Sequence, residues 1–189
     1  RECNLFETDA VVVDDFKGAY LVTEHLISVG CKNIVHLSAP DNILIGRLRK
    51  EGYIKALTDN NQPVDPSNIY LCDTREKVID KIHRILSKEV KPDGFFAVND
   101  STAIAVIQEL IKRDYKVPRD IAVAGFGDGP QASIICPTLT TVEQNGYEIG
   151  FEATRFLLER IAHGDVAPTI RRKVFDPVLV KRESTNRSI

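Results

Sequence analysis

The stretch Gly94-Phe95-Phe96-Ala97-Val98-Asn99-Asp100 decides the fold of this chain. Its first five residues form an apolar run, which is typical of a strand buried on both faces of a sheet. Directly after Asp100, an apolar stripe predicts a helix, because its members recur at helical spacing: Ile104, Ile107, Leu110 and Ile111. A second apolar run at 121–124 stops at Gly125-Phe126-Gly127-Asp128. The spacing therefore predicts a strand–helix–strand unit with parallel strands and a right-handed crossover.

The same alternation continues on both sides of this unit. The expected strands are 10–13, 34–37, 69–72, 94–98, 121–124, 139–142, 170–175 and 178–181, and the expected helices include 16–29, 46–59 and 147–163. This order predicts an α/β fold with a doubly wound, mostly parallel sheet and helices on both faces. Gly52 lies inside the 46–59 helix, where glycine costs about 1 kcal/mol relative to alanine. We therefore expect Gly52 to pack closely against the sheet.

Polar side chains follow the ends of the two central strands. Asn99 and Asp100 end the first apolar run and Asp128 follows the second. Ligands of open α/β sheets bind beyond the carboxyl ends of the strands, so we expect a polar small-molecule site here. A simpler role for Asp100 is to cap the following helix. Arg47 and Arg49 are either a solvated pair or a fork of donors for sugar hydroxyls, a carboxylate or a phosphate.

Composition narrows the class of protein. The 189 residues are 43% hydrophobic and 28% charged, with a net charge of −2, which argues against a nucleic-acid surface within them. No apolar run is long enough for a membrane span. The four cysteines form no CxxC pair, which favours a reducing compartment without excluding disulfides: Cys3, Cys31, Cys72 and Cys136. The four histidines have no ligand spacing, so no metal site is expected.

Motifs for catalysis or for a cofactor are weak. The run Gly125-Phe126-Gly127-Asp128-Gly129 is similar to a dinucleotide loop, but Pro130 occupies the place of the third glycine. We therefore expect no nucleotide cofactor. No GxSxG, HExxH or P-loop motif occurs. Asp100 and Asp128 could form a carboxylate pair for acid/base chemistry, but no motif places a nucleophile or a base, so we expect a protein that is not an enzyme.

A series of short motifs runs in order along nearly the whole chain. They are Asp14-Asp15, Gly18-Ala19, His25-Leu26, Arg49-Lys50-Glu51-Gly52-Tyr53, Ala56-Leu57, Pro92-Asp93, Ala97-Val98-Asn99-Asp100, Pro118-Arg119-Asp120-Ile121-Ala122-Val123, Gly125-Phe126, Pro137-Thr138-Leu139-Thr140-Thr141-Val142, Gln144, Gly150, Leu179-Val180-Lys181-Arg182 and Ser184-Thr185. Together they resemble the effector-binding domain of the LacI/GalR family of bacterial transcription regulators, which is related in fold to periplasmic sugar-binding proteins.

This resemblance implies two lobes hinged around a sugar or a nucleoside, preceded by a helix-turn-helix. It implies a first-lobe remnant at 1–30, a second lobe at 31–138, a crossover with a returning first-lobe helix at 139–169, and closing strands with a tail at 170–189. The DNA-binding head and most of the first lobe would lie outside this chain. The expected partners are a small effector, DNA through the missing domain only, and a second copy of the chain. The expected location is the cytoplasm, without membrane contact.

The resemblance also implies the site residues. Arg49 matches an arginine that binds effector hydroxyls, Asn99 an asparagine at a strand end, and Gln144 a polar position beside the hinge. The family commonly has an aspartate where this chain has Gly127. Either Asp128 takes over that contact, or the ligand lacks the hydroxyl pair that the aspartate holds. With Asp100 from the strand-end cluster, the expected effector site therefore comprises Arg49, Asn99, Asp100, Asp128 and Gln144.

Two further expectations remain open. A periplasmic sugar receptor that serves a transporter would share the fold, and the sequence upstream of Arg1 would distinguish it through a signal peptide instead of a helix-turn-helix. We also expect self-association, because the helices at 16–29 and 147–163 would belong to a lobe whose sheet is mostly missing. Their uncovered stripe would comprise Ala19, Val22, Leu26, Ile149, Ala153, Phe156 and Leu157.

Overall fold

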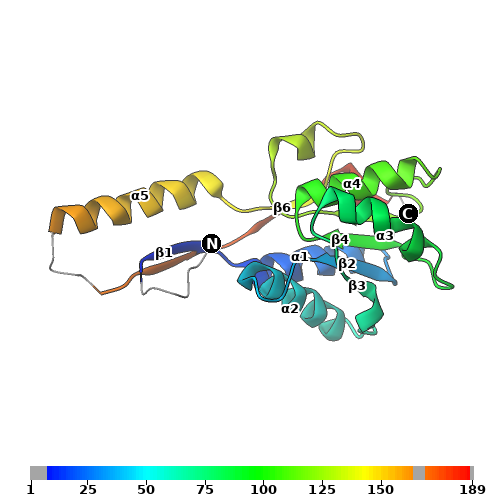
Figure 1. Cartoon of the computed structure of the whole chain (residues 1–189), viewed down its shortest axis with the longest axis horizontal. Helices are drawn as coiled ribbons and strands as arrows, with labels where there is room; N and C mark the ends of the chain where they lie inside the picture. Colours follow the sequence, from blue (N-terminus) through cyan, green and yellow to red (C-terminus); the bar gives the residue numbers. More distant parts are fainter. Residues whose placement is uncertain (1–7, 164–168, 188–189) are drawn as a thin grey trace.

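The computed structural model describes residues 8–163 and 169–187, which form a larger body and an extended arm (Figure 1). The sheet of the larger body has the strand order β3-β2-β4-β5, and all of its pairs are parallel. Its strands are β2 (Ile34–Ser38), β3 (Ile69–Leu71), β4 (Gly94–Ala97) and β5 (Ala122–Ala124). The strand–helix–strand unit predicted from the sequence therefore forms one half of this sheet, with β4 inside it and β5 at its edge.

Helices cover both faces of the sheet. They are α1 (Asp15–Ser28) and α2 (Leu44–Asp59) on one face, and α3 (Arg75–Leu86) and α4 (Asp100–Ile111) on the other. Successive side chains of a strand point to opposite faces, so Phe96 packs with the first helix pair and Phe95 with the second. Both rings are fully buried, and each contributes roughly 1.5–3 kcal/mol through its burial. The doubly wound α/β prediction is confirmed.

Helix α1 belongs by its packing to the larger body. Asp14 caps its start by accepting a hydrogen bond from the Lys17 amide at 2.9 Å. Ala19, Val22 and Leu26 are fully buried in the same apolar cluster as residues of α2, β4 and β5. The prediction that this helix has an uncovered stripe is wrong, because α2 and the sheet cover it. The prediction that the helix belongs to the first lobe is also wrong, because the chain has already entered the larger body at Asp14.

The close contact expected at Gly52 exists, but it is made with α1. A Cβ atom at Gly52 would lie 2.3 Å from the Phe16 carbonyl oxygen and 2.9 Å from the Ala19 Cβ. The glycine therefore allows two helices on the same face to approach each other, whereas the sequence suggested an approach to the sheet.

The arm consists of β1 (Ala10–Val13), α5 (Gly146–His163) and β7 (Arg172–Phe175). Strand β1 pairs in parallel with β7, and α5 lies beside this pair (Figure 1). Asp9 joins the three elements, since its carboxylate accepts hydrogen bonds from Arg160 at 2.8 Å and from Arg171 at 3.0 Å. The hydrogen bonds from Arg160 hold the pKa of Asp9 far below its usual value.

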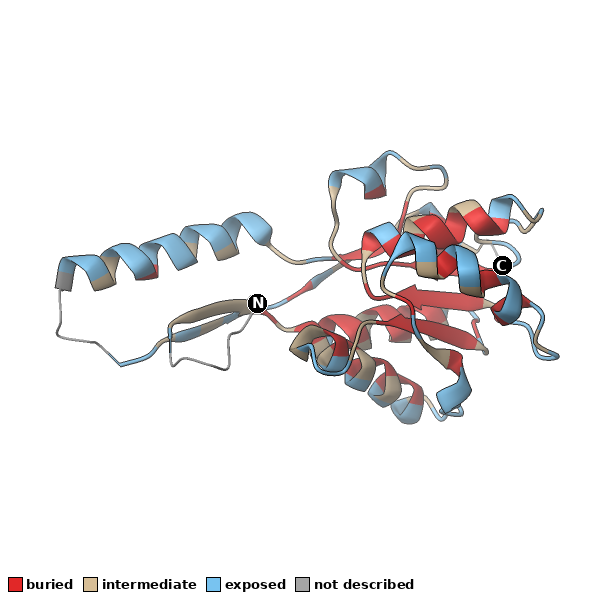
Figure 2. Cartoon of the chain, in the orientation of Figure 1, coloured by how far each residue is buried: buried red, intermediate tan, exposed pale blue. Residues whose placement is uncertain are grey.

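Most of α5 is uncovered in the described structure (Figure 2). Of the stripe expected to lack cover on this helix, Phe156 is buried, whereas Leu157 is 59% exposed. Ile161, on the next turn, is 68% exposed. Tyr147 and Phe151 add further exposed apolar surface. Among the described residues, the sheet of the arm has two strands, so it covers one side of the helix and leaves the other sides exposed.

Three chain crossings connect the arm with the larger body. The first lies between β1 and α1, where the Asp14 amide donates to the Phe175 carbonyl at 3.0 Å. The other two contain β6 (Thr141–Glu143) and β8 (Val178–Val180), which pair antiparallel to each other. Thr140 also forms a parallel bridge with Ala124 of β5. Short 3-10 turns complete the body: η1 (Pro66–Asn68), η2 (Pro130–Ser133) and η3 (Glu183–Thr185).

Several titratable side chains lie in the core of the larger body. His36 of β2 is fully buried between the rings of Tyr53 and Phe96, at centroid distances of 5.1 and 4.6 Å, and burial lowers its pKa to about 4. Cys31 and Cys72 are buried free thiols, whose pKa values burial raises to about 12 and about 11. Cys136 is an exposed free thiol, and Cys3 lies outside the described residues.

Two classes of feature are absent from residues 8–163 and 169–187. No helix there combines the length and the hydropathy needed to cross a bilayer. No group of three histidine, cysteine or acidic side chains is arranged to hold a metal ion there.

Candidate functional site

The five predicted effector residues lie around the carboxyl ends of β4, β5 and β6. Asn99 and Asp100 follow β4, Asp128 follows β5 by a short loop, and Gln144 follows β6 directly. Arg49 reaches the same region from the first half of α2, since one of its donors binds the Val98 carbonyl at the end of β4. This edge of the sheet faces the three crossings to the arm (Figure 1).

Arg49 is buried, with 4% of its surface exposed, whereas the side chain of Arg47 is 56% exposed. The Arg49 Nε donates to Asp15 Oδ1 at 2.7 Å, and Nη2 lies 2.5 Å from the same oxygen. The guanidinium also stacks on Phe126, with its central carbon 3.5 Å from the ring centroid. The two arginines are therefore not a solvated pair, because only Arg47 is in solvent.

Asp15 was expected only as part of the Asp14-Asp15 motif after the strand at 10–13, and not as a residue of the site. Its contact with Arg49 could not be expected from the sequence, because the two residues are 34 positions apart. Burial raises the pKa of Asp15, and the charge of Arg49 opposes that rise. A guanidinium has five N–H groups, and the described contacts of Arg49 use three of them. The other two N–H groups have no hydrogen-bond acceptor among the described residues.

Asp100 does not cap α4, contrary to the simpler expectation. The cap is Asn99, whose side-chain oxygen accepts from the Thr102 amide at 2.8 Å. The Asn99 amide group donates to the Asp73 carbonyl at 3.2 Å. Asp100 instead turns toward the next strand end, where it accepts from Thr141 Oγ1 at 2.5 Å and from the Gly129 amide at 2.9 Å. Burial raises the pKa of Asp100, and these hydrogen bonds oppose the rise.

The loop after β5 places Gly127 beside Asp100 and directs the side chain of Asp128 toward Arg182. A Cβ at Gly127 would lie 3.2 Å from Asp100 Oδ2 and 3.6 Å from Gln144 Nε2, so these two side chains flank the glycine. Asp128 adopts a left-handed φ of 51°, and its Oδ1 accepts from Arg182 Nη1 at 2.7 Å. Sequence reasoning missed Arg182, which is 54 residues from its partner.

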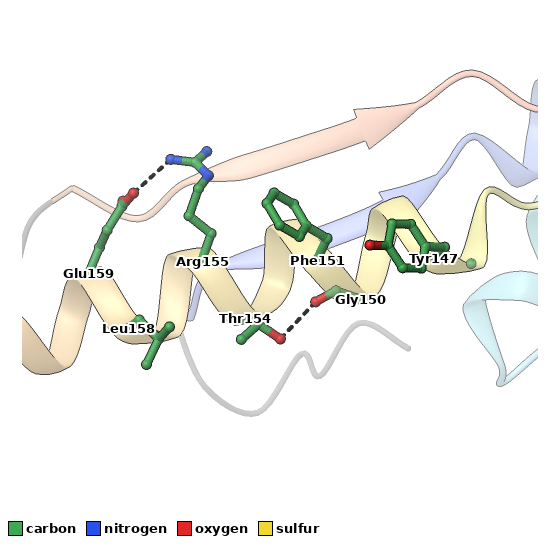
Figure 3. A pocket seen from close by; sticks show the side chains of 8 residues that line it. Tyr147, Gly150, Phe151, Thr154, Arg155, Leu158 and Glu159 are labelled. Carbon is green, nitrogen blue, oxygen red and sulfur yellow. Dashed lines mark hydrogen bonds and ion pairs between the residues drawn. The ribbon is translucent and has the colours of Figure 1, made fainter.

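A hollow of about 630 Å³ lies along α5, separate from the polar cluster at the sheet edge (Figure 3). Its lining includes Tyr147, Phe151, Leu158 and the Arg155–Glu159 ion pair at 2.7 Å. None of the five predicted effector residues contributes to it. It is the side of one exposed helix, whereas the polar cluster at the sheet edge brings together side chains from several elements.

Comparisons with known proteins agree with this architecture. The family model described as a periplasmic binding protein-like domain matches residues 23–185. The repressor PurR of Mannheimia succiniciproducens is 32% identical over 193 residues, covering 96% of this chain and 54% of that protein. PurR of Haemophilus influenzae strain PittEE is 33% identical over 159 residues, covering 84% and 47%.

Solved structures show the same relationship. A LacI-family regulator of Sanguibacter keddieii has a TM-score of 0.87 at 32% identity, with 94% of this chain and 67% of that chain covered. The regulator CelR in complex with cellobiose has a TM-score of 0.87 at 27% identity, with 94% and 54% covered. A LacI-family regulator of Enterococcus faecium with bound ribose has a TM-score of 0.84 at 26% identity, with 97% and 66% covered.

These matches define first the class, a periplasmic binding protein-like ligand-binding domain. Within that class, the chain belongs to the LacI/GalR family as an effector-binding domain. It spans about half the length of the curated relatives that it matches.

Proposed function

We propose that this domain binds a small neutral sugar at the carboxyl edge of its sheet and thereby controls DNA binding by a helix-turn-helix outside this chain. The observation that carries the proposal is the convergence of Arg49, Asp100 and Gln144 beside the crossings to the arm. Arg49 retains donors for hydroxyl groups, and a ligand in contact with both lobes would favour a closed arrangement. The solved relatives named with cellobiose and with ribose support a sugar, whereas the curated relatives of higher identity are named as PurR repressors, so the test must include purines as the competing class.

The proposed setting is that of a cytoplasmic dimeric regulator rather than a periplasmic receptor or an enzyme. The curated relatives are named as transcriptional repressors, and the solved relatives as transcriptional regulators. A ligand shifts the equilibrium between open and closed states only by its difference in affinity for them. Within the proposal, side chains of the larger body contact the ligand in both states. The arm and the lobe to which it belongs add contacts in the closed state, and these raise the affinity of that state.

The test is calorimetry of the full-length protein against a panel of monosaccharides, disaccharides, purine bases and nucleosides. We expect at least one neutral sugar to bind and to change the affinity of the protein for its operator. Gln144→Ala should lower the affinity for that sugar about tenfold, because a hydrogen bond to a neutral partner contributes about 0.5–1.5 kcal/mol. Gln62→Ala is the matched control, since this half-buried glutamine follows the far end of α2. Binding of a nucleoside and no sugar would replace the sugar proposal, and binding of neither would reject it.

A further inference from the structure

In the loop between β5 and η2, the three backbone N–H groups at 127–129 all donate hydrogen bonds within the protein. The Gly127 amide donates to the Val142 carbonyl at 2.8 Å. The Asp128 amide donates to Thr141 Oγ1 at 3.4 Å, and the Gly129 amide to Asp100 Oδ2 at 2.9 Å. All three amides are thus directed toward β6 and the start of α4. Residues 127–129 are therefore attached to the rest of the larger body, and their amides are not directed toward a molecule beside them.

Arg182 fixes the one charged side chain of this loop. Its Nη1 donates to Asp128 Oδ1 at 2.7 Å and to the Leu139 carbonyl at 2.9 Å. Its own amide donates to Thr140 Oγ1 at 2.8 Å. The side chains of Arg182 and Asp128 are 20% and 18% exposed, so solvent screens this pair much less than a surface ion pair.

The turn η3, which follows Arg182 directly, is buried and hydrogen-bonded to the rest of the larger body. Ser184 Oγ accepts from the Thr140 amide at 2.8 Å and donates to the Val123 carbonyl at 2.6 Å. Thr185 Oγ1 lies 2.7 Å from Thr140 Oγ1 and 2.8 Å from His25 Nε2. Arg182 therefore extends from a turn held by β5, β6 and α1, and it can hold Asp128 in one place.

We propose that Arg182 is a positioning residue of the effector site, which holds the Asp128 carboxylate toward the third crossing and leaves Gly127 beside the ligand. This inference rests on the proposed function and narrows its ligand class. The amides at 127–129 offer no N–H donor, and the carboxylates of Asp100 and Asp128 lie close to them. A phosphate or carboxylate against this part of the loop would face two carboxylates and would receive no hydrogen bond from these backbone amides. The group of the effector that lies against Gly127 is therefore uncharged, which selects a neutral sugar over a sugar phosphate.

The first measurement is amide hydrogen exchange of the full-length protein without ligand. Arg182→Gln and Asp128→Asn should each accelerate exchange at residues 127–129 at least tenfold, and the double variant should add little, because both remove one interaction. Arg182→Lys should restore part of the protection. Arg119→Gln is the control, since Arg119 is 68% exposed and paired only with its neighbour Asp120. Unchanged exchange at residues 127–129, or fully additive effects, would overturn the positioning role.

The second measurement is the affinity for whichever sugar the wild-type protein binds. Arg182→Gln should lower it at least tenfold, Arg182→Lys should recover part of that loss, and Arg119→Gln should leave it unchanged. Equal affinity in wild type and Arg182→Gln would overturn the positioning role even if the melting temperature fell. Preference for a phosphorylated sugar over its parent sugar would overturn the ligand class. If exchange responds but no sugar binds, the positioning role stands and the proposed function fails.

Discussion

Arg49 connects the stability of the larger body with its site. We predict that Arg49→Lys lowers the free energy of unfolding by roughly 2–4 kcal/mol, because an ammonium cannot reproduce the two-nitrogen contact with Asp15 and a buried carboxylate then lacks part of its partner. Urea unfolding measures the loss. Arg47→Lys, on the exposed side of the same helix, should change it by less than about 0.5 kcal/mol. Equal small effects at both positions would contradict the buried pair.

His36 makes stability depend on pH. The pKa of His36 is about 4 in the folded protein, whereas an unfolded histidine titrates near 6.5. Between these values the unfolded state binds the proton and the folded state does not, so its contribution is complete above pH 6.5 and decreases as the pH falls. We expect a loss of roughly 3 kcal/mol by pH 4, at 1.36 kcal/mol per pKa unit.

Urea unfolding at pH 7.5, 6.0 and 5.0 tests this expectation against His36→Gln, which does not titrate. The variant should be less stable than wild type at pH 7.5, because it loses the stacking with Tyr53 and Phe96. The difference between the two proteins should then shrink as the pH falls. A constant difference across this range would show that His36 does not cause the pH dependence.

At the residue scale, the sequence predicted which polar side chains lie at the strand ends better than it predicted the contacts that they make. Asn99, Asp100 and Asp128 were expected at strand ends, and they lie there because strand ends can be read from where apolar runs stop. Their partners could not be read in this way. Asp15–Arg49 and Asp128–Arg182 join residues 34 and 54 positions apart, and no local pattern specifies which polar side chains meet across such a distance.

At the scale of elements, the contact between α1 and α2 depends on Gly52. Gly52→Ala should lower the free energy of unfolding by about 1–3 kcal/mol, although alanine is the better helix former, since the new Cβ would meet backbone of α1. Gly150→Ala is the matched control on α5, where a Cβ meets nothing within 4 Å and should stabilise the helix by up to ~1 kcal/mol. Circular dichroism during unfolding measures both, and a stabilised Gly52→Ala would refute the close contact.

The elements of the larger body could be predicted because their apolar patterns are strong and each packs on its neighbours in the chain. The placement of α1 could not, because its stripe of Ala19, Val22 and Leu26 shows only that one face is covered. It does not show which partner covers that face. The partner became evident from two glycines: Gly52 allows α2 to approach α1, and Gly18 of α1 allows the ring of Phe126, which follows β5, to approach it.

At the scale of the whole molecule, the exposed face of α5 predicts self-association of this chain. Phe151, Leu157, Leu158 and Ile161 are each about 60% exposed or more, and hiding such a face from water is favourable. Sedimentation should show association that grows with concentration, and the double variant Phe151→Ser/Leu158→Ser should reduce it. Val90→Ser is the control, since Val90 is 68% exposed on the larger body. A monomer at all concentrations would contradict the prediction.

The turn η3 has a consequence for the order in which the molecule can be made. Ser184 and Thr185 close the edge formed by β5 and β6, yet they follow every other described helix and strand in the chain. A ribosome that has produced β5 has therefore not yet produced the hydroxyl that binds the Val123 carbonyl, 61 residues later. Until that turn emerges, the nascent larger body has an unfinished edge strand, and such edges are where newly made chains pair wrongly or recruit chaperones.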